Sequence, residues 1–521
     1  MTAPPDLARR LIAQANATMA AHQAGDLAAA ERGYRELVPQ LEHPALLSNF
    51  GALLVQTGRP AEAVPHLRRA ACIAKDRVGA LANLAAALRD TGGVEEAECC
   101  LRESLALDPA AVGALATLGA LLTERDALDE AESCLRRAIA LQPAVADHLF
   151  NLGVLLRRRM DIPAAEAAYR RALVLDPGHV EAADNLAVLL GDSGRLEEGL
   201  ALYRALLDRQ PGRHDRRFWY GNMLVAAGWW REGWVAYEAR REYLPGARLP
   251  EGLAPWTGAP LPGGTLLLRA EQGIGDALLA VRFLPAVLAR VRRVVLAVHR
   301  PLVRLLADSL PGAVTVLALE DDPGMVDAAL PLMSLFAVLD VAPEDVDGRP
   351  YLAAPERLRA AWRRRLGSGP GDRPTVGIVW AGNPSYVHDR YRSPGLEAVR
   401  PLLETASVRW VVLQVGPGRA ALADRPLPNG VLDLGAEVAD FADTAAILAE
   451  LDLVVSSDTA VAHLAGALGR PCHVMAPALL GLYWLGEEPG LSRWYDSVTV
   501  HRQARLGDWS DVVASVAAAL D

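Results

Sequence analysis

Residues 151–177 read NLGVLLRRRMDIPAAEAAYRRALVLDP, and features of this stretch return through the first half of the chain every 34 residues. A small residue is followed twelve positions later by a second small residue, and four positions further on by a bulky one. The first small position holds Gly51, Ala85, Gly119, Gly153, Ala187 and Gly221; the second holds Ala63, Ala97, Ala131, Ala165, Gly199 and Gly233; the bulky position holds Leu67, Leu101, Leu135, Tyr169, Tyr203 and Tyr237. Small residues let two antiparallel helices approach, and prolines recur where a helix must stop, at Pro109, Pro143, Pro177 and Pro211. The period therefore predicts a solenoid of helical hairpins.

This repeat resembles the tetratricopeptide repeat (TPR) family, and residues 151–177 are close to the family's consensus. A weaker unit around Ala30 and Tyr34 precedes the series, giving about seven units over roughly residues 10–243. Repeats of this kind do no chemistry, but they form a curved surface that holds another chain. We therefore expect residues 1–243 to form a TPR α-solenoid that binds a protein partner.

A row of asparagines occupies the sixth position of the first helix in most units. Its members are Asn16, Asn49, Asn83, Asn151 and Asn185, and the series is broken by Thr117 and Trp219. A carboxamide can donate to a backbone carbonyl and accept from a backbone N–H, so such a row can hold an extended peptide of any sequence. The row is similar to the asparagine ladder of O-GlcNAc transferases. The alternative is that asparagine is simply common at this TPR position, and both interpretations stay open.

Length and composition limit the classes of protein that the chain can be. At 521 residues it is long enough for two or three folding units, and 51% hydrophobic with 5% aromatic residues suits packed helices. The net charge is −10 and no Lys/Arg-rich cluster is present, so nucleic acid is not an expected partner. No apolar run approaches the roughly 18 residues that span a bilayer, and residues 1–20 lack a secretory signal's apolar core. We expect a cytoplasmic protein without stable membrane insertion.

The pattern changes after Tyr243. Residues 244–264 are rich in proline and glycine, as expected of a linker. Short apolar strands followed by helices then begin at residues 265–270, 293–299, 314–319, 375–382, 409–415, 451–457 and 472–477. This alternation predicts parallel sheets covered on both faces, and a soft boundary near residues 363–374 divides the segment into lobes 265–365 and 374–521. The predicted fold class is therefore α + α/β, with a cleft between the two Rossmann-like lobes.

The first strand runs into the sequence AEQGIGDALLAVRFLP, residues 270–285. Gly273 and Gly275 permit a tight turn, and Asp276 opens the next helix. The third glycine of a dinucleotide fingerprint is absent, because Leu278 takes its place, and this disfavours an NAD-dependent dehydrogenase. Asp276 is a candidate to take a proton from an acceptor hydroxyl, and the alternative is a simple helix cap.

A second strand-to-helix turn holds Asp458 and Thr459. Ligands of open α/β sheets bind at the carboxyl ends of the strands, and the positive end of the following helix suits a diphosphate. His463 lies one helical turn further on and is a candidate to face the same cleft, with helix packing as the alternative.

The loop WAGNPSYVHDRYRSP, residues 380–394, gathers His388, Arg390 and Arg392. Fixed cations can stabilise a departing nucleoside diphosphate without a metal, and the alternative is that they are solvated loop charges. No Asp-x-Asp pair stands at a strand end, which argues against a divalent cation. Four aromatic residues can either stack on a donor or pack in the core: Trp380, Trp484, Trp494 and Tyr495.

Residues 265–520 resemble bacterial glycosyltransferases of the heptosyltransferase type, similar to glycosyltransferase family 9 and of the GT-B fold. The resemblance rests on GIGDALLAVRFLP (273–285), DTAVAHLAGALGRP (458–471), RWYDSVTVHRQ (493–503) and GDW (507–509). It implies inverting, metal-independent transfer from a nucleotide sugar, with no other cofactor. By motif, Asp276 matches the family's candidate base, whereas Asp458, Thr459, Ala460 and His463 match donor contacts. Arg392 lies near the family's phosphate-binding lysine, and Ala460 replaces a common glycine, so the donor's identity stays open.

A peptide-holding solenoid joined to a sugar-transfer module favours glycosylation of a protein on Ser or Thr. TPR-linked transferases that modify flagellins or other surface proteins have this arrangement, so the resemblance implies a flagellin-type acceptor. Two alternatives stay open: a transferase acting on lipopolysaccharide, and a non-catalytic TPR adaptor with a degenerate α/β half.

Overall fold

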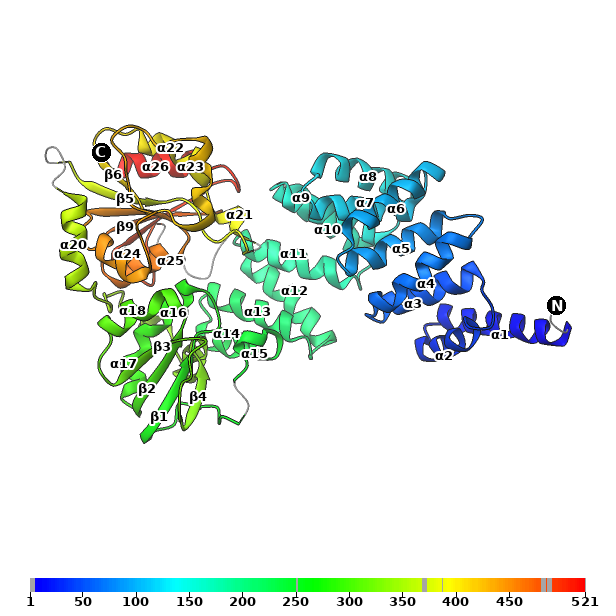
Figure 1. Cartoon of the computed structure of the whole chain (residues 1–521), viewed down its shortest axis with the longest axis horizontal. Coiled ribbons are helices and arrows are strands. Elements are labelled where there is room, and N and C mark those ends of the chain that lie inside the picture. Colours follow the sequence, from blue (N-terminus) through cyan, green and yellow to red (C-terminus); the bar gives the residue numbers. More distant parts are fainter. Residues whose placement is uncertain are drawn as a thin grey trace. The chain divides into compact units, whose positions relative to one another are not determined.

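The computed structural model describes residues 5–249, 252–367, 373–386, 388–478, 484 and 490–520. The chain divides into two compact units, Met1–Ala183 and Asp184–Asp521. In Figure 1 the first unit runs from blue to cyan, and the second continues from green to red.

Helical hairpins build the first unit. Its helices are α1 (Pro5–Gln23), α2 (Leu27–Leu37), α3 (Pro44–Gln56), α4 (Pro60–Ile73), α5 (Val78–Asp90), α6 (Val94–Leu107), α7 (Val112–Glu124), α8 (Leu128–Leu141), α9 (Ala146–Arg158) and α10 (Ile162–Leu175). Each odd-numbered helix packs against the next helix, and α1, α3, α5, α7 and α9 also pack in series, so the first helices of successive hairpins share one face (Figure 1). The predicted helical solenoid is therefore confirmed for this unit.

The small positions of the repeat are required by close packing within each hairpin. A Cβ added to Gly119 would lie 2.6 Å from Leu135 Cγ, and one added to Gly153 would lie 2.5 Å from Tyr169 Cε1. Both distances are shorter than carbon atoms tolerate, so the bulky position of each hairpin fills the space that its own glycine leaves.

The second unit begins with further hairpin helices. These are α11 (Val180–Asp192), which starts just before the boundary, α12 (Leu196–Arg209), α13 (His214–Ala226), α14 (Trp230–Tyr237) and the short α15 (Arg240–Tyr243). Helices α13 and α14 form a hairpin, and α14 also packs on α19 (Leu335–Val338) of the α/β region. The last helical hairpin is thus part of the same compact unit as the α/β region.

The first α/β lobe contains a four-stranded parallel sheet. Its strands are β1 (Leu261–Arg269), β2 (Val291–Val298), β3 (Val314–Ala318) and β4 (Ala328–Pro331), in the order β3-β2-β1-β4. Its remaining helices are α16 (Ile274–Ala280), α17 (Leu284–Leu288) and α18 (Arg300–Ser309). The next helix, α20 (Glu356–Leu366), packs on α24 (Phe441–Leu448) of the second lobe. Strand β1 begins at Leu261, inside the expected linker, and the Trp256 N–H donates to Ala329 O at 2.9 Å. Trp256 is buried, so its apolar surface ties the end of this segment to the sheet.

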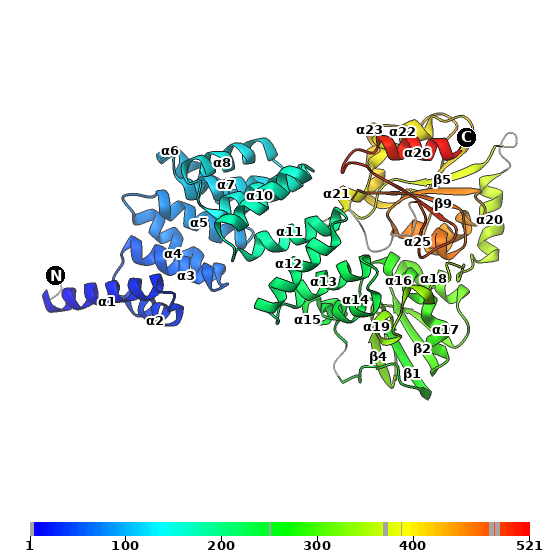
Figure 2. The same ribbon diagram turned by 180° about the vertical axis from the view of Figure 1, so that it is seen from behind.

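The second α/β lobe contains a six-stranded parallel sheet. Its strands are β5 (Thr375–Val379), β6 (Arg409–Val412), β7 (Leu432–Asp433), β8 (Leu453–Ser457), β9 (Cys472–Ala476) and β10 (Val498–Arg502), in the order β10-β9-β8-β5-β6-β7. Its helices are α21 (Asp389–Arg392), α22 (Gly395–Leu403), α23 (Ala421–Asp424), α24 (Phe441–Leu448), α25 (Ala460–Ala467) and α26 (Ser510–Leu520). Helices α22 and α26 pack together on one face of the sheet, whereas α24 and α25 lie on the other (Figure 1). Figure 2 shows α22, α25 and α26 from behind. The prediction of parallel α/β sheets is confirmed.

The second unit contains several buried hydrophobic clusters, and one of them extends from the last hairpin through both lobes. It includes Phe218 and Trp234 of the last hairpin, Leu268 of β1 and Val454 of β8. The last hairpin and both sheets therefore share a continuous buried surface, and we expect them to unfold together.

No helix in the part of the chain that the structure describes is both long enough and apolar enough to cross a membrane.

Candidate functional site

The order of the strands in each sheet indicates where a ligand would bind, which is at the carboxyl ends of the strands where the strand order reverses. In the second lobe the chain runs from β5 to β6 and β7 on one side and then returns to β8, β9 and β10 on the other. A crevice forms at such a switch point, outside the carboxyl ends of the two strands that flank it. These are β5, which leads into the loop with His388, Arg390 and Arg392, and β8, which leads into Asp458 and Thr459. The topology therefore brings together two of the predicted site segments.

The first lobe has the same kind of switch point between β1 and β4. Strand β1 leads into the turn before α16, where the Gly273 N–H donates to Asp276 Oδ2 at 2.8 Å. Asp276 thus closes the first turn of its helix and is half-buried. The capping role that we considered for Asp276 is present, and it fixes where the carboxylate lies.

The turn after β8 is held by polar contacts. Thr459 is the N-cap residue of α25 and its hydroxyl lies 3.1 Å from the buried Ser456 hydroxyl. Asp458 Oδ1 accepts a hydrogen bond from the indole N–H of Trp484 at 2.6 Å. Ala460 is the first residue of α25 and is half-buried.

His463 links the two turns. A Cβ added to Gly275 would lie 2.8 Å from His463 Cδ2, so α16 and α25 touch and position 275 accepts no side chain. The His463 ring is buried and packs against the Trp484 ring, with centroids 4.7 Å apart, and its Nδ1 lies 3.0 Å from the Tyr495 hydroxyl. Burial lowers the pKa of His463 to about 3, helped by the positive charges of Arg282 and Arg392, so the imidazole is neutral at physiological pH.

The loop after β5 adds cations and an aromatic ring. Arg392 donates from Nε to Asp389 Oδ1 at 3.1 Å, and its guanidinium carbon lies 4.6 Å from the centre of the Tyr386 ring. Partial burial raises the pKa of Tyr386, which is 45% exposed, to about 12. Arg392 opposes this rise, and the carboxylates of Asp458, Asp276 and Asp192 add to it. Charges from both α/β turns therefore act on the same phenol. His388 and Arg390 are half-buried in the same loop, and Val387 lies outside the described residues.

The turn that carries Asp276 is bound to the last helical hairpin and to α15, the short helix that follows it. Arg240 and Glu271, both with side chains no more than 1% exposed, form an ion pair of 2.8 Å, and Arg240 also donates to Ser334 Oγ at 2.9 Å. The next residue, Gln272, donates from Nε2 to the Tyr237 hydroxyl at 2.6 Å. Helix α15 and the hairpin thus anchor the two residues that immediately precede Gly273.

The asparagine row divides between the two units. Asn16, Asn49, Asn83 and Asn151 lie on α1, α3, α5 and α9 of the first unit, and Asn185 lies on α11 in the second. Asn16 is exposed and the others are half-buried. Asn83 Nδ2 donates to Ser48 Oγ at 3.0 Å, and Asn49 hydrogen-bonds the Tyr34 hydroxyl. Two of these carboxamides therefore make contacts inside the solenoid, and peptide binding by the row stays a prediction.

Several residues of the candidate site were not singled out from the sequence. Arg282 donates to the Trp494 carbonyl at 2.8 Å and stacks on the Tyr495 ring, 5.0 Å from its centre. Gln414 accepts the N–H groups of Trp380 and Ala381 at 3.0 and 2.9 Å and so orders the end of β5. The four aromatic residues that could have stacked on a donor are buried to 3% exposure or less, which confirms the packing alternative for Trp380, Trp484, Trp494 and Tyr495.

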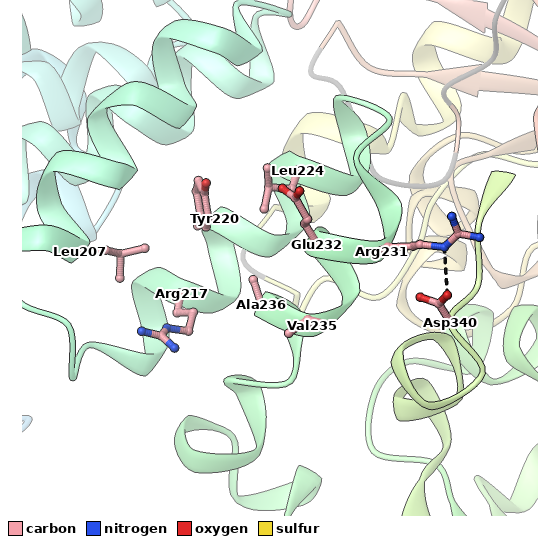
Figure 3. Close-up of a pocket in the computed structure, with 9 residues that line it drawn as sticks. All are labelled: Leu207, Arg217, Tyr220, Leu224, Arg231, Glu232, Val235, Ala236 and Asp340. Carbon is pink, nitrogen blue, oxygen red and sulfur yellow. Dashed lines mark ion pairs between the residues drawn. The ribbon is translucent and has the colours of Figure 1, made fainter. Parts of the chain in front are cut away.

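A separate pocket of about 540 Å³ lies among α12, α13 and α14 (Figure 3). Leu207, Leu224 and Val235 supply its apolar lining, and Arg231 at its edge forms an ion pair with Asp340 at 3.0 Å. Its lining residues include none of the predicted site residues.

Comparisons with known proteins support the repeats. Models of the tetratricopeptide repeat match residues 45–80 and 120–180, which confirms TPR repeats in the N-terminal region. The chain is 28% identical over 306 residues to Protein FlbA of Caulobacter vibrioides, an alignment that covers 54% of this chain and 49% of that protein. The chain thus spans about half the length of this curated relative.

Solved structures of TPR proteins resemble part of the chain. One from Thermus thermophilus is 26% identical with a TM-score of 0.33, covering 35% of this chain and 99% of its own. Another, from Parabacteroides merdae, is 16% identical with a TM-score of 0.37, covering 46% of this chain and 94% of its own.

Proposed function

We propose that the second unit is a glycosyltransferase that moves a sugar from a nucleotide-sugar donor to a Ser or Thr hydroxyl of a protein. In this proposal the two α/β lobes form a GT-B-like pair. The observation that supports it best is the contact between α16 and α25, the helices that follow β1 and β8, where Gly275 meets His463. This contact joins the helices that begin at the carboxyl end of one strand from each sheet, which suits a ligand that both lobes bind.

The donor's diphosphate would lie at the start of α25. The helix dipole and the N–H groups of its first turn favour negative charge, and Thr459 adds a hydroxyl. Arg390 and Arg392, on the loop after the neighbouring strand β5, would supply positive charge as the diphosphate departs. This assignment needs no metal ion.

Asp276 would act as the general base. The acceptor oxygen bonds to the anomeric carbon as the bond from that carbon to the phosphate oxygen breaks. The hydroxyl proton passes to the Asp276 carboxylate, and the nucleoside diphosphate leaves with the electron pair. Attack opposite the leaving group inverts the anomeric centre. The Gly273 N–H holds the carboxylate in place, so little reorganisation is needed at the moment of transfer.

The TPR repeats support a protein as the acceptor, because such repeats present a surface for another polypeptide. We further propose a flagellin-type or other surface protein, a choice that rests on the sequence resemblance to TPR-linked transferases.

Release of nucleotide from UDP-, GDP-, ADP-, dTDP- and CMP-sugars by the purified protein tests this function. We expect one donor to be hydrolysed, and we expect the Asp276→Ala and Asp458→Ala variants to lose the activity while remaining folded.

Asp345→Ala is the matched control, because Asp345 Oδ2 accepts the Ala342 N–H at 2.8 Å in the same arrangement as Asp276 and Gly273. It should retain wild-type hydrolysis. Absence of hydrolysis with all five donors, or equal rates in Asp276→Ala and wild type, would leave the adaptor alternative in place.

A further inference from the structure

Trp219 stands where the asparagine row would continue on α13, the first helix of the last hairpin. Its side chain is 36% exposed, so part of the indole can contact a ligand. Its ring packs beside the buried Phe218 ring, with centroids 5.1 Å apart. Phe218 therefore packs against one part of the indole, and the exposed part can contact a ligand.

Trp219 also touches the loop after β5. Its ring meets the His388 ring edge-on, with centroids 6.4 Å apart and an angle of 87°. His388 in turn lies 5.4 Å from the Tyr386 ring, and Tyr386 lies under Arg392. A row of rings thus runs from the last helical hairpin to the predicted donor-binding loop.

The hairpin that carries Trp219 is held firmly to both lobes. Trp230 of α14 stacks on Trp494, with ring centroids 4.8 Å apart and an angle of 18°, and Trp234 stacks on Phe336 at 4.3 Å. A fixed aromatic surface loses little conformational entropy when a ligand binds to it. Trp219 is therefore suited to hold a substrate near the donor.

We propose that Trp219, with His388 beside it, forms an acceptor subsite that binds an apolar or aromatic side chain close to the Ser or Thr that receives the sugar. The identification of the bound segment as an acceptor rests on the proposed function. The subsite itself rests on the geometry of α13. Trp219 would thus set specificity for the acceptor without taking part in the bond-forming step.

Three carboxylates near the loop oppose the charges of Arg390 and Arg392, and we expect them to disfavour an acidic residue beside the acceptor hydroxyl. The Tyr386 phenol interacts electrostatically with the carboxylates of Asp458, Asp276 and Asp192 and with the guanidinium of Arg392. A donor diphosphate adds further negative charge. A carboxylate beside the acceptor hydroxyl would be repelled, whereas an aromatic or aliphatic side chain gains contact with the indole.

Fluorescein-labelled decapeptides test the subsite. Each contains one Ser in an alanine background, with Phe, Leu, Ala or Glu placed in turn at each position within four residues of the Ser. Fluorescence anisotropy measures binding to the full-length protein with no need for catalysis. Sugar transfer to the same peptides is then measured with the nucleotide sugar that the hydrolysis assay identifies.

We expect wild type to bind the Phe and Leu peptides at least tenfold more tightly than the Ala and Glu peptides at one position relative to the Ser. Trp219→Ala should lose this preference and raise KM for the peptide, with kcat and donor hydrolysis unchanged, and Trp219→Phe should retain most of the preference. Trp229→Ala is the matched control, since Trp229 is also exposed, at 52%, and should leave the profile unaltered.

Three results would overturn the subsite: no positional preference in wild type, no binding of any peptide, or a Trp219→Ala profile equal to that of wild type. A failure of donor hydrolysis with preserved Trp219-dependent peptide binding would instead overturn the transferase function and leave the subsite as a peptide-binding site.

Discussion

Replacing Arg240 by methionine should destabilise the second unit, because it leaves a buried carboxylate without its cation. The Arg240 side chain is fully buried and that of Glu271 is 1% exposed. Once Arg240 is gone, the Met333 N–H, at 3.3 Å, stays as a donor to Glu271. Breaking a buried ion pair from one side costs about 3–5 kcal/mol of unfolding free energy. Removing both charges of a buried pair is often neutral, so Arg240→Met/Glu271→Met should recover part of the loss. The recovery is only partial because Arg240 also pairs with Glu238, which is 24% exposed and keeps the Ser334 hydroxyl as a donor.

The pH dependence provides a second signature of the same cause. Burial raises the pKa of the Glu271 carboxyl, and attraction to Arg240 opposes that rise. Removing Arg240 raises this pKa further, so the folded Arg240→Met variant binds a proton that the unfolded chain releases. Its stability therefore falls as the pH rises through the folded pKa, and its deficit against wild type should be smaller at pH 5 than at pH 8.

Tryptophan fluorescence during urea unfolding is a suitable assay. All 11 tryptophans, from Trp219 to Trp509, lie in the second unit, so the signal reports the unfolding of that unit alone. The exposed pair of Arg300 and Glu320 supplies the control, and Arg300→Met should change stability little. An Arg240→Met variant within about 1 kcal/mol of wild type at pH 8, or a double variant no more stable than the single one, would refute the reasoning.

Two further predictions concern the contact between the lobes. Gly275→Ala places a Cβ 2.8 Å from His463 Cδ2 and should cost about 1–3 kcal/mol by forcing α16 from α25, whereas Gly312→Ala, whose added Cβ meets open space, should cost little in the same urea titration. In the folded protein the pKa of His463 is about 3, against an ordinary value of 6.5, so its ring stays neutral. As the pH falls from 6.5 towards 3, the unfolded chain binds a proton at His463 that the folded protein does not bind, and the free energy of unfolding decreases. His463→Gln should flatten stability against pH over this window, and an unchanged slope would show that His463 does not cause it.

The repeats could be predicted from sequence because their packing is local and periodic. Gly119 and Leu135, or Gly153 and Tyr169, lie sixteen positions apart, and each pair meets within one hairpin. The longer strands were also predictable from their apolar runs. Strands β4 and β7 were missed because Ala328–Pro331 and Leu432–Asp433 are too short to show a pattern. Strand β10 was also missed, although the alternation of apolar and polar residues in Val498–Arg502 is typical of a half-buried strand.

The site was only partly predictable, because its remaining contacts join residues far apart in the chain. Gly275 and His463 were each singled out, but no sequence pattern indicates that they touch. From the sequence, Arg240 is expected to be one of the exposed charges at a helix end. It is buried because it pairs with Glu271, a residue 31 positions later in the chain. Contacts between separate elements depend on the packing of the second unit, which local periodicity does not encode.

Nucleotide binding to the second unit is the most direct test of a donor site at the meeting of the two lobes. Tryptophan-detected thermal unfolding should be recorded with UDP-, GDP-, ADP-, dTDP- and CMP-sugars in turn. We predict that one nucleotide class stabilises the unit, by about 2.7 kcal/mol at a donor concentration 100 times Kd, and that Asp458→Ala loses this response. No stabilisation by any of the five, or an undiminished response in Asp458→Ala, would contradict a donor site built on the turns after β1 and β8.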